Sequence, residues 1–422
     1  MLMLLLHLMS ELCPNHTRAI YIDHQLQSQS ASWGGFVAEQ CQQRNIPCIV
    51  QAVEVATGNL ENQARQARYD AYLQHLAPNE VLVLAHHQQD QAETLMLRVL
   101  SGAGIHGLAA MQAVDVREEM TIWRPLLDVS REQICQWAHQ LNVKNIEDPT
   151  NLDTHYDRAW CREILWPLLE SRYPKMQQAL SRTSYLMQDA EEILASVLET
   201  DLKACGSGQA LCLETLLALP QARQRQLLSA WMKGLAQYRP AFEMVQRLVN
   251  EVILAKADAQ AALHWNGFYY VRFAGWMYRL AKAEYLASAQ EQTVPSTLSL
   301  DLHQVFTVLS GKFQVQENRH VQAMGLSPAL LNKPLILSAR QGGEKIHLQG
   351  RVGSWPLKKA IQQAQIFPWQ RHTIQILSID NVMLGVFTPK GFWLAVSSYC
   401  VIGGWRPNVI STVENITSGL ES

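Results

Sequence analysis

The sequence lacks the cysteine and histidine patterns that are typical of metal-binding and disulfide-rich proteins. Its eight cysteines are scattered along 422 residues without a C-x-x-C pair, and its histidines are not clustered. This spacing argues against a zinc ribbon, an iron–sulfur cluster or a disulfide framework, and it favours buried thiols in a reducing compartment. We therefore expect a cytoplasmic protein.

A strong charge of either sign is also missing. The formal net charge is −2, with 48% hydrophobic and 17% charged residues, which is ordinary for a soluble globular protein. Nothing global indicates a nucleic-acid partner, so any basic surface must be local. At 422 residues, the chain is long enough for two or three domains, each with its own core.

No segment has the length and composition of a transmembrane helix. The most apolar stretch is MLMLLLHLMSEL at residues 1–12, which is too short to span a bilayer. It lacks the basic leader and the small-residue cleavage site of a signal peptide. We expect a buried first helix here and no membrane partner.

A glycine-rich phosphate loop between a first strand and a first helix is absent as well. Such a loop binds phosphate because glycines let the ligand approach backbone N–H groups at a helix N-terminus. Here the chain opens on the predicted helix 1–12. The glycine-rich segment Ser101–Gly107 follows a predicted helix rather than a strand, so we interpret it as a turn.

The chemistry-bearing stretch that is present lies at residues 81–94. Val81–Ala85 is an unbroken apolar run, typical of a strand buried on both faces, and a helical pattern follows from Gln88. His86, Asp90 and Glu93 have the spacing i, i+4, i+7, so they share one face if the helix begins early. They could hold Mg²⁺ and orient a phosphate or a proton donor, or they could belong to a solvated helix face.

The first part of the chain alternates predicted strands with predicted helices, which indicates an α/β fold with a parallel sheet and helices on both faces. The predicted strands cover residues 18–24, 47–55, 81–85 and 121–127, and the predicted helices cover residues 32–45, 59–76, 88–100 and 131–141. Open sheets of this kind place their ligands at the carboxyl ends of the strands.

The character of the sequence changes near residue 173. Helices are predicted at 177–204, 221–236 and 241–256, a hairpin at 261–280, a linker at 284–296, and strands at 298–309 and 311–316. Residues 331–420 carry nine Lys and Arg against three Asp and Glu. Trp355 and Trp369 lie among these basic residues. Such a surface suits RNA phosphates and unstacked bases, although a solvated basic face is an equal alternative.

Several motifs occur in an order that resembles the tRNA(Ile)-lysidine synthetase family of PP-loop ATP pyrophosphatases. They are Glu61-x-x-Ala64-Arg65-x-x-Arg68-Tyr69, Ala85-His86-His87-x-x-Asp90-Gln91-x-Glu93-Thr94, Arg124-Pro125-Leu126-Leu127, Glu147-Asp148-Pro149-Thr150-Asn151 and Tyr156-x-Arg158. Towards the end of the chain, Arg351-x-Gly353, Leu357-Lys358-Lys359 and Pro368-Trp369-x-Arg371 resemble the C-terminal tRNA-binding domain of the same family.

The resemblance implies three domains. Residues 1–172 would form a Rossmann-like PP-loop catalytic domain, residues 173–285 a mostly helical substrate-binding domain, and residues 297–422 a small α+β tRNA-binding region with its compact part at about 331–420. It also implies ATP and Mg²⁺ as cofactors, tRNA(Ile) with a CAU anticodon and free L-lysine as substrates, and a possible homodimer. The implied reaction adenylates the wobble cytidine and then replaces AMP with lysine, which forms lysidine.

Individual roles follow from the same resemblance. Asp90 and Glu93 would bind Mg²⁺ and position the lysine amine, and His86 would contact phosphate or the activated base. Arg65 and Arg158 would neutralise phosphate charge, although Glu61 and Arg65 could instead form only an i, i+4 salt bridge. From the residues alone, Arg158 and Arg162 could meet phosphates or merely cap neighbouring helices. His24 would contact the nucleotide. The residues predicted to bind tRNA are Arg351, Lys358, Lys359 and Arg371.

This sequence departs from the family pattern in a few places. The family's Ser-Gly-Gly-x-Asp-Ser loop would precede the helix at residues 1–12, so we expect a sheet without its first strand and weak ATP binding. Gln25, Gln89, Ser101 and Ala159 stand where the family often has other residues. Two alternatives follow: a catalytically inactive tRNA-binding remnant, or another PP-loop enzyme such as a tRNA 2-thiolating enzyme, whose usual cysteine pairs are absent here.

Overall fold

The computed structural model divides the chain into two compact units, residues 1–197 and 198–422. The structure describes residues 1–27, 29–56, 60–117, 119–146, 152–234, 236, 238–256, 259, 261–287, 295–318, 323–349 and 351–412, except for the side chains of residues 60–62. Since the chain divides into two units here, the division into three domains stays a prediction.

The strands of the first unit pair in parallel, as predicted, but in two separate sheets. β1 (Ala19–Asp23) pairs with β2 (Cys48–Ala52), and β3 (Val81–Val83) pairs with β5 (Met120–Trp123). An antiparallel strand that we did not predict, β4 (Val114–Arg117), closes the second sheet. Its alternating sequence Val-Asp-Val-Arg is the signal that would have predicted it.

Helices cover both faces of β3. Consecutive residues of a strand point to opposite sides, so neighbouring residues of β3 contact different helices. On one side Leu82 packs with Tyr69 of α3, and on the other Val83 packs against Leu4 and Ile134 of α1 and α6. The predicted first helix is thus confirmed, but only one face of it is buried, at Leu4, Leu5 and Ser10. The helices in the described part of residues 1–140 are α1 (Leu2–Leu12), α2 (Ser30–Gln42), α3 (Leu60–His75), α4 (Gln88–Leu100), α5 (Ile105–Leu108) and α6 (Arg131–Gln140).

Helix α2 approaches β1 and β2 closely at a glycine. A Cβ at Gly34 would lie 3.2 Å from the Val50 side chain and 3.3 Å from the Tyr21 ring. These separations are tighter than ordinary van der Waals contact, so a residue larger than glycine would push the helix away from the strands.

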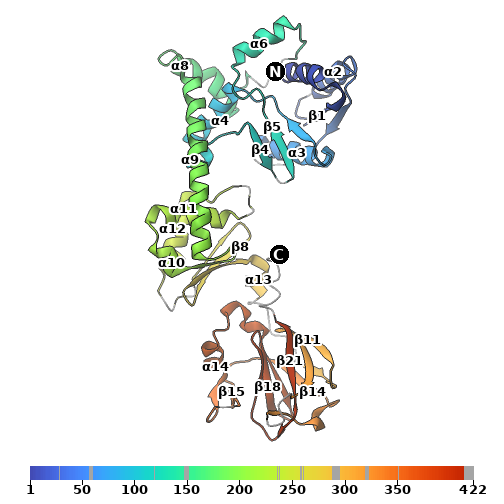
Figure 1. The fold of residues 1–422 in the computed structure, drawn as a ribbon, viewed down its shortest axis with the longest axis vertical. Helices are drawn as coiled ribbons and strands as arrows, with labels where there is room; N and C mark the ends of the chain where they lie inside the picture. Colours follow the sequence, from blue (N-terminus) through green and yellow to red (C-terminus); the bar gives the residue numbers. More distant parts are fainter. Residues whose placement is uncertain are drawn as a thin grey trace. The chain divides into compact units, whose positions relative to one another are not determined.

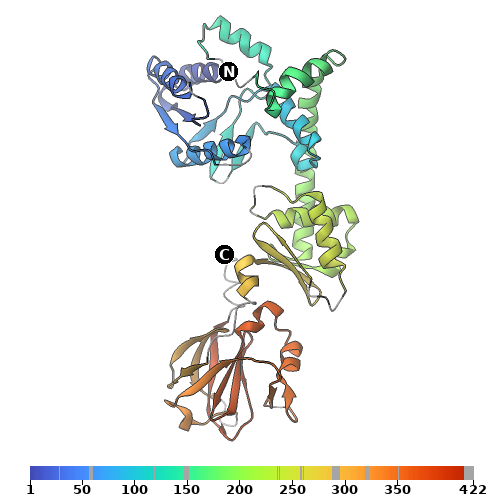
Figure 2. The same ribbon diagram turned by 180° about the vertical axis from the view of Figure 1, so that it is seen from behind.

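The long helix α9 (Met176–Cys205) begins in the first unit, where it lies beside α4 (Figures 1 and 2), and its Gln188 side chain donates to the carbonyls of Ala109 and Met111 just after α5. The buried Gln91 side chain of α4 joins the two helices, since its amide nitrogen donates to Ser184 Oγ at 2.9 Å. Between α6 and α9 the chain forms α7 (Asp157–Trp160), a π-helical turn (Cys161–Leu165) and α8 (Trp166–Glu170).

The second unit starts with helices and an antiparallel sheet. The hairpin predicted at 261–280 is in fact three strands, β7 (Ala262–Trp265), β8 (Phe268–Phe273) and β9 (Trp276–Ala281), and β6 (Ala210–Cys212) pairs with β9 to make a fourth. Three residues are too few to show a strand period, which is why β6 escaped prediction. The helices are α10 (Leu213–Ala218), α11 (Gln221–Lys233), α12 (Phe242–Arg247) with a π-helical extension (Leu248–Ile253), and α13 (Lys282–Ala287).

The last part of the second unit is rich in strands and holds two five-stranded sheets. One contains β10 (Ser296–Leu298), β14 (Leu335–Ala339), β17 (Gln375–Ile379), β18 (Val382–Thr388) and β19 (Gly391–Leu394). The other contains β11 (Val305–Val308), β12 (Gly311–Glu317), β21 (Trp405–Thr412), β13 (Met324–Leu326) and β20 (Cys400–Ile402). Because β12 pairs with β21, residues 311–317 share a core with residues near the chain's end.

Two hydrophobic clusters stabilise this part. The larger one joins the two sheets through the buried side chains of Phe313, Phe387 and Trp405. The smaller one lies under α14 (Leu357–Gln363) and contains Leu357 and Val386. The short pair β15 (Lys345–Ile346) and β16 (Trp355–Pro356) precedes that helix. Two predicted boundaries were wrong: residues 299–304 break the strand predicted at 298–309, and α13 runs into the predicted linker.

None of the helices in the described part of the chain combines the length and the apolar content that crossing a membrane requires.

Candidate active site

Three of the predicted site residues, His86, Asp90 and Glu93, lie at the junction between β3 and α4. Helix α4 begins at Gln88, after His86, so His86, Asp90 and Glu93 do not share one helical face. Instead the backbone N–H of His87 donates to Asp90 Oδ2 at 3.0 Å, and the His87 ring pairs with the same oxygen. Asp90 therefore closes the first turn of the helix in addition to any chemical role.

Glu93 is fully buried and forms a bidentate salt bridge with an arginine that we did not assign to the site. Arg162 Nε donates to Glu93 Oε1 at 2.6 Å, and an Nη nitrogen donates to Oε2 at 2.7 Å. The same nitrogen lies 3.4 Å from Asp90 Oδ1. Arg158 is more distant, at 3.8 Å from Asp90 and 3.7 Å from Glu93, and it donates to Thr94 Oγ1 at 3.2 Å.

The two carboxylates have opposite pKa shifts. Burial alone would raise the pKa of Asp90, but the hydrogen bond from His87 and the nearby Arg158 charge lower it to about 2. Burial raises the pKa of Glu93, and the Arg162 salt bridge opposes that shift. Asp90 is therefore the more acidic member of the pair.

His86 lies in a strongly basic environment. Burial lowers its pKa to about 3, and although Asp90 opposes the shift, the charges of Arg124, Arg158 and Arg65 contribute to it. Its Nδ1 atom is buried and has no hydrogen-bond partner among the described atoms. A neutral imidazole with an unsatisfied nitrogen can donate to or accept from a ligand at neutral pH.

Several arginines lie around His86 in the described part of the chain. Burial lowers the pKa of Arg65, and so do the charges of Arg117, Arg68 and Arg158, which places these cations near one another. Asp115 lies 3.0 Å from Arg117 and 3.6 Å from the buried Arg124, so one carboxylate serves two arginines. This basic wall attracts anions, and a polyphosphate fits its charge.

His24 belongs to the same region. It directly follows β1, its pKa is lowered by burial and by the charge of Arg68, and its Nδ1 atom has no partner among the described atoms. The structure thus brings His24, Arg65, His86 and Arg158 around one basic wall, with Asp90 and Glu93 beside it. Arg65 lies close to both Arg68, which neighbours His24, and Arg158, which neighbours the two carboxylates.

The residues do not fit a magnesium ion held jointly by Asp90 and Glu93. Both oxygens of Glu93 accept from Arg162, Asp90 Oδ2 accepts from His87, and Asp90 Oδ1 lies 3.4 Å from an Arg162 nitrogen, so every oxygen of the pair already faces a donor. Mg²⁺ prefers an octahedral shell of oxygen ligands. No group of three or more His, Cys, Asp or Glu in the described residues is arranged for a metal.

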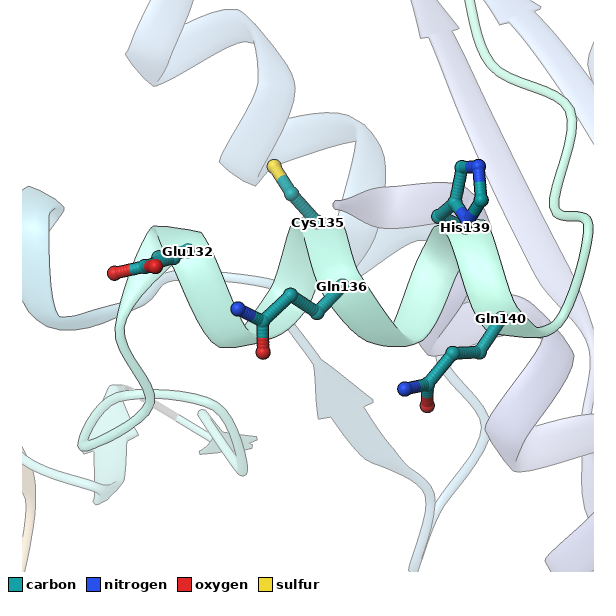
Figure 3. A pocket seen from close by; sticks show the side chains of 5 residues that line it. All are labelled: Glu132, Cys135, Gln136, His139 and Gln140. Carbon is teal, nitrogen blue, oxygen red and sulfur yellow. The ribbon is translucent and has the colours of Figure 1, made fainter.

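A hollow on α6 is a weaker candidate for a site. It measures about 380 Å³ and is lined by Glu132, Cys135, Gln136, His139 and Gln140, all from one helix. Figure 3 shows these side chains pointing to different sides of the helix, with the Cys135 sulfur directed away from the Gln136 and Gln140 amides. A binding site needs polar groups that converge, so we assign no function to this hollow.

The residues predicted to bind tRNA lie in the last part of the second unit. Lys358 and Lys359 are exposed in the first turn of α14, and the Arg351 guanidinium stacks on the Trp355 ring at 4.7 Å. Arg371 is half-buried, and its Nε donates to a backbone carbonyl at 3.2 Å. Trp369 was predicted to be on the RNA-binding surface, but it is only 5% exposed because it stacks with a neighbouring Phe ring and packs on the β8–β9 hairpin.

Some sequence predictions fall outside the described residues. These are the Glu147–Asn151 motif and the side chain of Glu61, with its alternative salt bridge. Of the variant positions, Ser101 ends α4 at the surface, and Ala159 is buried in α7. His87 and Arg124 were not predicted to act at the site, and for Arg162 phosphate contact and helix capping were left as equal alternatives.

Comparison with known proteins identifies the class first. Residues 2–169 match the PP-loop domain family, and residues 211–278 and 335–393 match the families described as "TilS substrate binding domain" and "TilS substrate C-terminal domain". The chain therefore carries a PP-loop domain of Rossmann-like type, followed by the two domains that accompany it in one family of enzymes.

The relatives define that family. The chain is 62% identical to the tRNA(Ile)-lysidine synthase of Acinetobacter baylyi over 97% of its own length and 89% of the relative. It is 32% identical to the enzyme of the same name from Escherichia coli O157:H7 over 89% of this chain and 86% of that one. The chain belongs to the tRNA(Ile)-lysidine synthase family.

Solved structures give weaker similarities. A U34-tRNA thiolase from Methanococcus maripaludis is 14% identical with a TM-score of 0.37, over 44% of this chain and 67% of that one. A TILS C-terminal domain is 13% identical with a TM-score of 0.22, over 28% of this chain and 100% of that one.

Proposed function

We propose that this protein ligates lysine to the wobble cytidine of tRNA(Ile) with a CAU anticodon and thereby forms lysidine. The reaction has two steps, and ATP is consumed in the first. The 2-carbonyl oxygen of the cytosine first attacks the α-phosphorus, which releases pyrophosphate and leaves an adenylated base. The lysine amine then attacks carbon 2, AMP leaves with the oxygen, and the amine loses a proton.

The observation that carries the proposal is the basic wall beside a buried carboxylate pair. Arg65 and Arg158 would neutralise the negative charge that develops as pyrophosphate departs. His86 is neutral at physiological pH, because its pKa is about 3, and its unpaired Nδ1 can contact a phosphate oxygen or the adenylated base. His24 would contact the same nucleotide from the end of β1.

Asp90 and Glu93 would act on the lysine. Asp90 keeps its negative charge at neutral pH, since its pKa is about 2, so its carboxylate can attract the ammonium group; its Oδ1 atom has only a long contact, at 3.4 Å, with Arg162. Glu93 is held by Arg162 and would define the position of that arginine and of Asp90. Magnesium was predicted from the family resemblance, but we assign no step to it, because Arg162 already occupies Glu93.

The tRNA would be bound in part by the exposed Lys358 and Lys359 of α14, together with Arg351 and Arg371. Of these, Arg371 contributes least to a phosphate surface, because it is half-buried and its Nε is already bonded to a carbonyl. The Lys358 and Lys359 ammonium groups are exposed and suit phosphates of the RNA backbone. Cytoplasmic tRNA and free lysine would be the partners in the cell, and a homodimer stays a prediction.

The test separates the two half-reactions. Pyrophosphate release is measured with ATP and a tRNA(Ile) transcript in the absence of lysine, and labelled lysine is then added to follow its transfer to the RNA. A tRNA(Met) transcript with the same anticodon is the control. We expect release and transfer with tRNA(Ile) only. Binding of tRNA(Ile) without pyrophosphate release would instead support the tRNA-binding remnant.

A further inference from the structure

The second unit contains a cavity of about 520 Å³, and none of its lining residues belongs to the group around His86 and Asp90. Its wall is formed by the turn before β16, by α14, and by strands β19 and β21. The polar side chains that line it are Arg351, Arg406, Gln349 and Gln363, and the apolar ones include Trp393 and Leu394. The volume is in the range of pockets that hold small organic ligands.

Both arginines of this cavity lack a carboxylate partner among the described residues. Arg351 donates to the amide oxygen of Gln363 at 2.6 Å, and Arg406 donates to the amide oxygen of Gln349. An amide oxygen is neutral, so it satisfies one N–H group and leaves the positive charge uncompensated. Two guanidinium groups at the wall of one cavity therefore favour an anionic ligand.

The arginines are also held in place before any ligand arrives. The Arg351 guanidinium stacks on the Trp355 ring at 4.7 Å, and Arg406 Nε donates to the Met324 carbonyl at 2.8 Å. Burial lowers the pKa of Arg406, as expected for a cation that is partly withdrawn from water without an anion. Such pre-organisation reduces the entropy cost of binding a planar or tetrahedral oxyanion.

The rest of the cavity offers a different chemistry. Trp393 is half-buried and supplies an aromatic wall, and Leu348 and Leu394 extend the apolar surface. Indole rings stack on nucleobases regardless of the base, and the amides of Gln349 and Gln363 can pair with base edges. A cavity that combines guanidinium groups, an aromatic wall and amides suits a phosphate joined to an unpaired base.

We propose that this cavity binds one unpaired nucleotide, with its phosphate at Arg351 and Arg406 and its base against Trp393. A base within a duplex cannot enter a concave site, so the ligand is a free mononucleotide or an unpaired nucleotide of an RNA strand. The cavity shares Arg351 with the proposed tRNA surface, but none of its lining residues takes part in the proposed ligation chemistry, so its occupation requires no catalysis.

The experiment changes the charge of the cavity without removing either arginine. In Gln363→Glu a carboxylate replaces the amide that already contacts Arg351, so it should pair with that arginine and repel phosphate. Gln362→Glu is the matched control, because Gln362 is exposed on the same helix, does not line the cavity and undergoes the same charge change. Both positions are exposed, so both variants should fold.

Binding of AMP, of a short single-stranded RNA and of a blunt RNA duplex is measured with the full chain by titration calorimetry at low salt. We expect Gln363→Glu to weaken AMP or single-stranded RNA by about tenfold relative to Gln362→Glu, with the duplex unaffected. Weakening of AMP identifies a free nucleotide as a ligand, and weakening of the RNA strand alone identifies an unpaired RNA residue. Equal affinities in the two variants for both ligands would overturn the proposal.

Catalysis is not read out in this experiment, so its result does not depend on the proposed lysidine formation. AMP that binds at the candidate active site would be affected equally by the two variants and therefore cancels in the comparison.

Discussion

Replacing Arg162 by alanine tests the physical basis of the candidate site. Glu93 is completely buried, and Arg162 donates to both of its oxygens, at 2.6 and 2.7 Å. The next cation, Arg158, forms an ion pair with Glu93 at the longer distance of 3.7 Å. Arg162→Ala thus leaves a buried carboxylate without its hydrogen-bond donors, which should lower the free energy of unfolding by about 3–5 kcal/mol.

The loss should also depend on pH, with a definite sign. Burial already raises the pKa of Glu93, and removal of Arg162 raises it further. In the variant, folded Glu93 then binds a proton more tightly than unfolded Glu93 does, so stability is greatest below the unfolded pKa and decreases as pH rises through the folded pKa. The difference between variant and wild type should therefore be small near pH 4.5 and grow towards neutral pH.

The assay is denaturant unfolding of the full chain, followed by tryptophan fluorescence at a series of pH values. The double variant Arg162→Ala with Glu93→Gln is the control, since an amide carries no charge and should recover most of the lost stability. The reasoning is refuted if Arg162→Ala costs less than about 1 kcal/mol at pH 7, or if its cost is the same at pH 5 and pH 8.

Three further predictions concern activity and binding. Asp90→Ala should reduce the rate of lysine transfer by at least about 100-fold, because the carboxylate that attracts the lysine ammonium group is removed, and should leave tRNA affinity nearly unchanged. It should also cost about 1 kcal/mol in unfolding through the lost helix-start contact, whereas complete loss of the fold would make Asp90 structural. His86 is already neutral above its pKa of about 3. His86→Asn should therefore lower the rate but leave the shape of its pH profile between about pH 5.5 and 8 the same as in wild type. An inflection near pH 6.5 that appears in wild type alone would contradict this. Replacing Lys358 and Lys359 with glutamine should weaken tRNA binding and reduce the slope of log affinity against log salt by about 1.5, whereas an unchanged slope would move the RNA surface elsewhere.

Periodicity and motif order predicted much of the fold. The apolar run at Val81–Ala85 and the change of pattern at Gln88 located β3 and α4, because buried strands and amphipathic helices have different hydrophobic periods. Short strands such as β6 were missed, because three residues show no hydrophobic period of their own and become a strand only by pairing with another strand, here β9. The parallel strands were expected in a single sheet, whereas the described residues form two.

The sequence by itself determined the family, the α/β class of the first part and the identity of most candidate site residues, because these depend on residue types at fixed spacing. Only the tertiary structure showed that Arg162 pairs with Glu93, that Trp369 is buried, and that Arg351 and Arg406 meet at one cavity. Each of these facts joins side chains from different elements, and their distances are set by how the elements pack. Residue spacing along the chain carries no information about such distances.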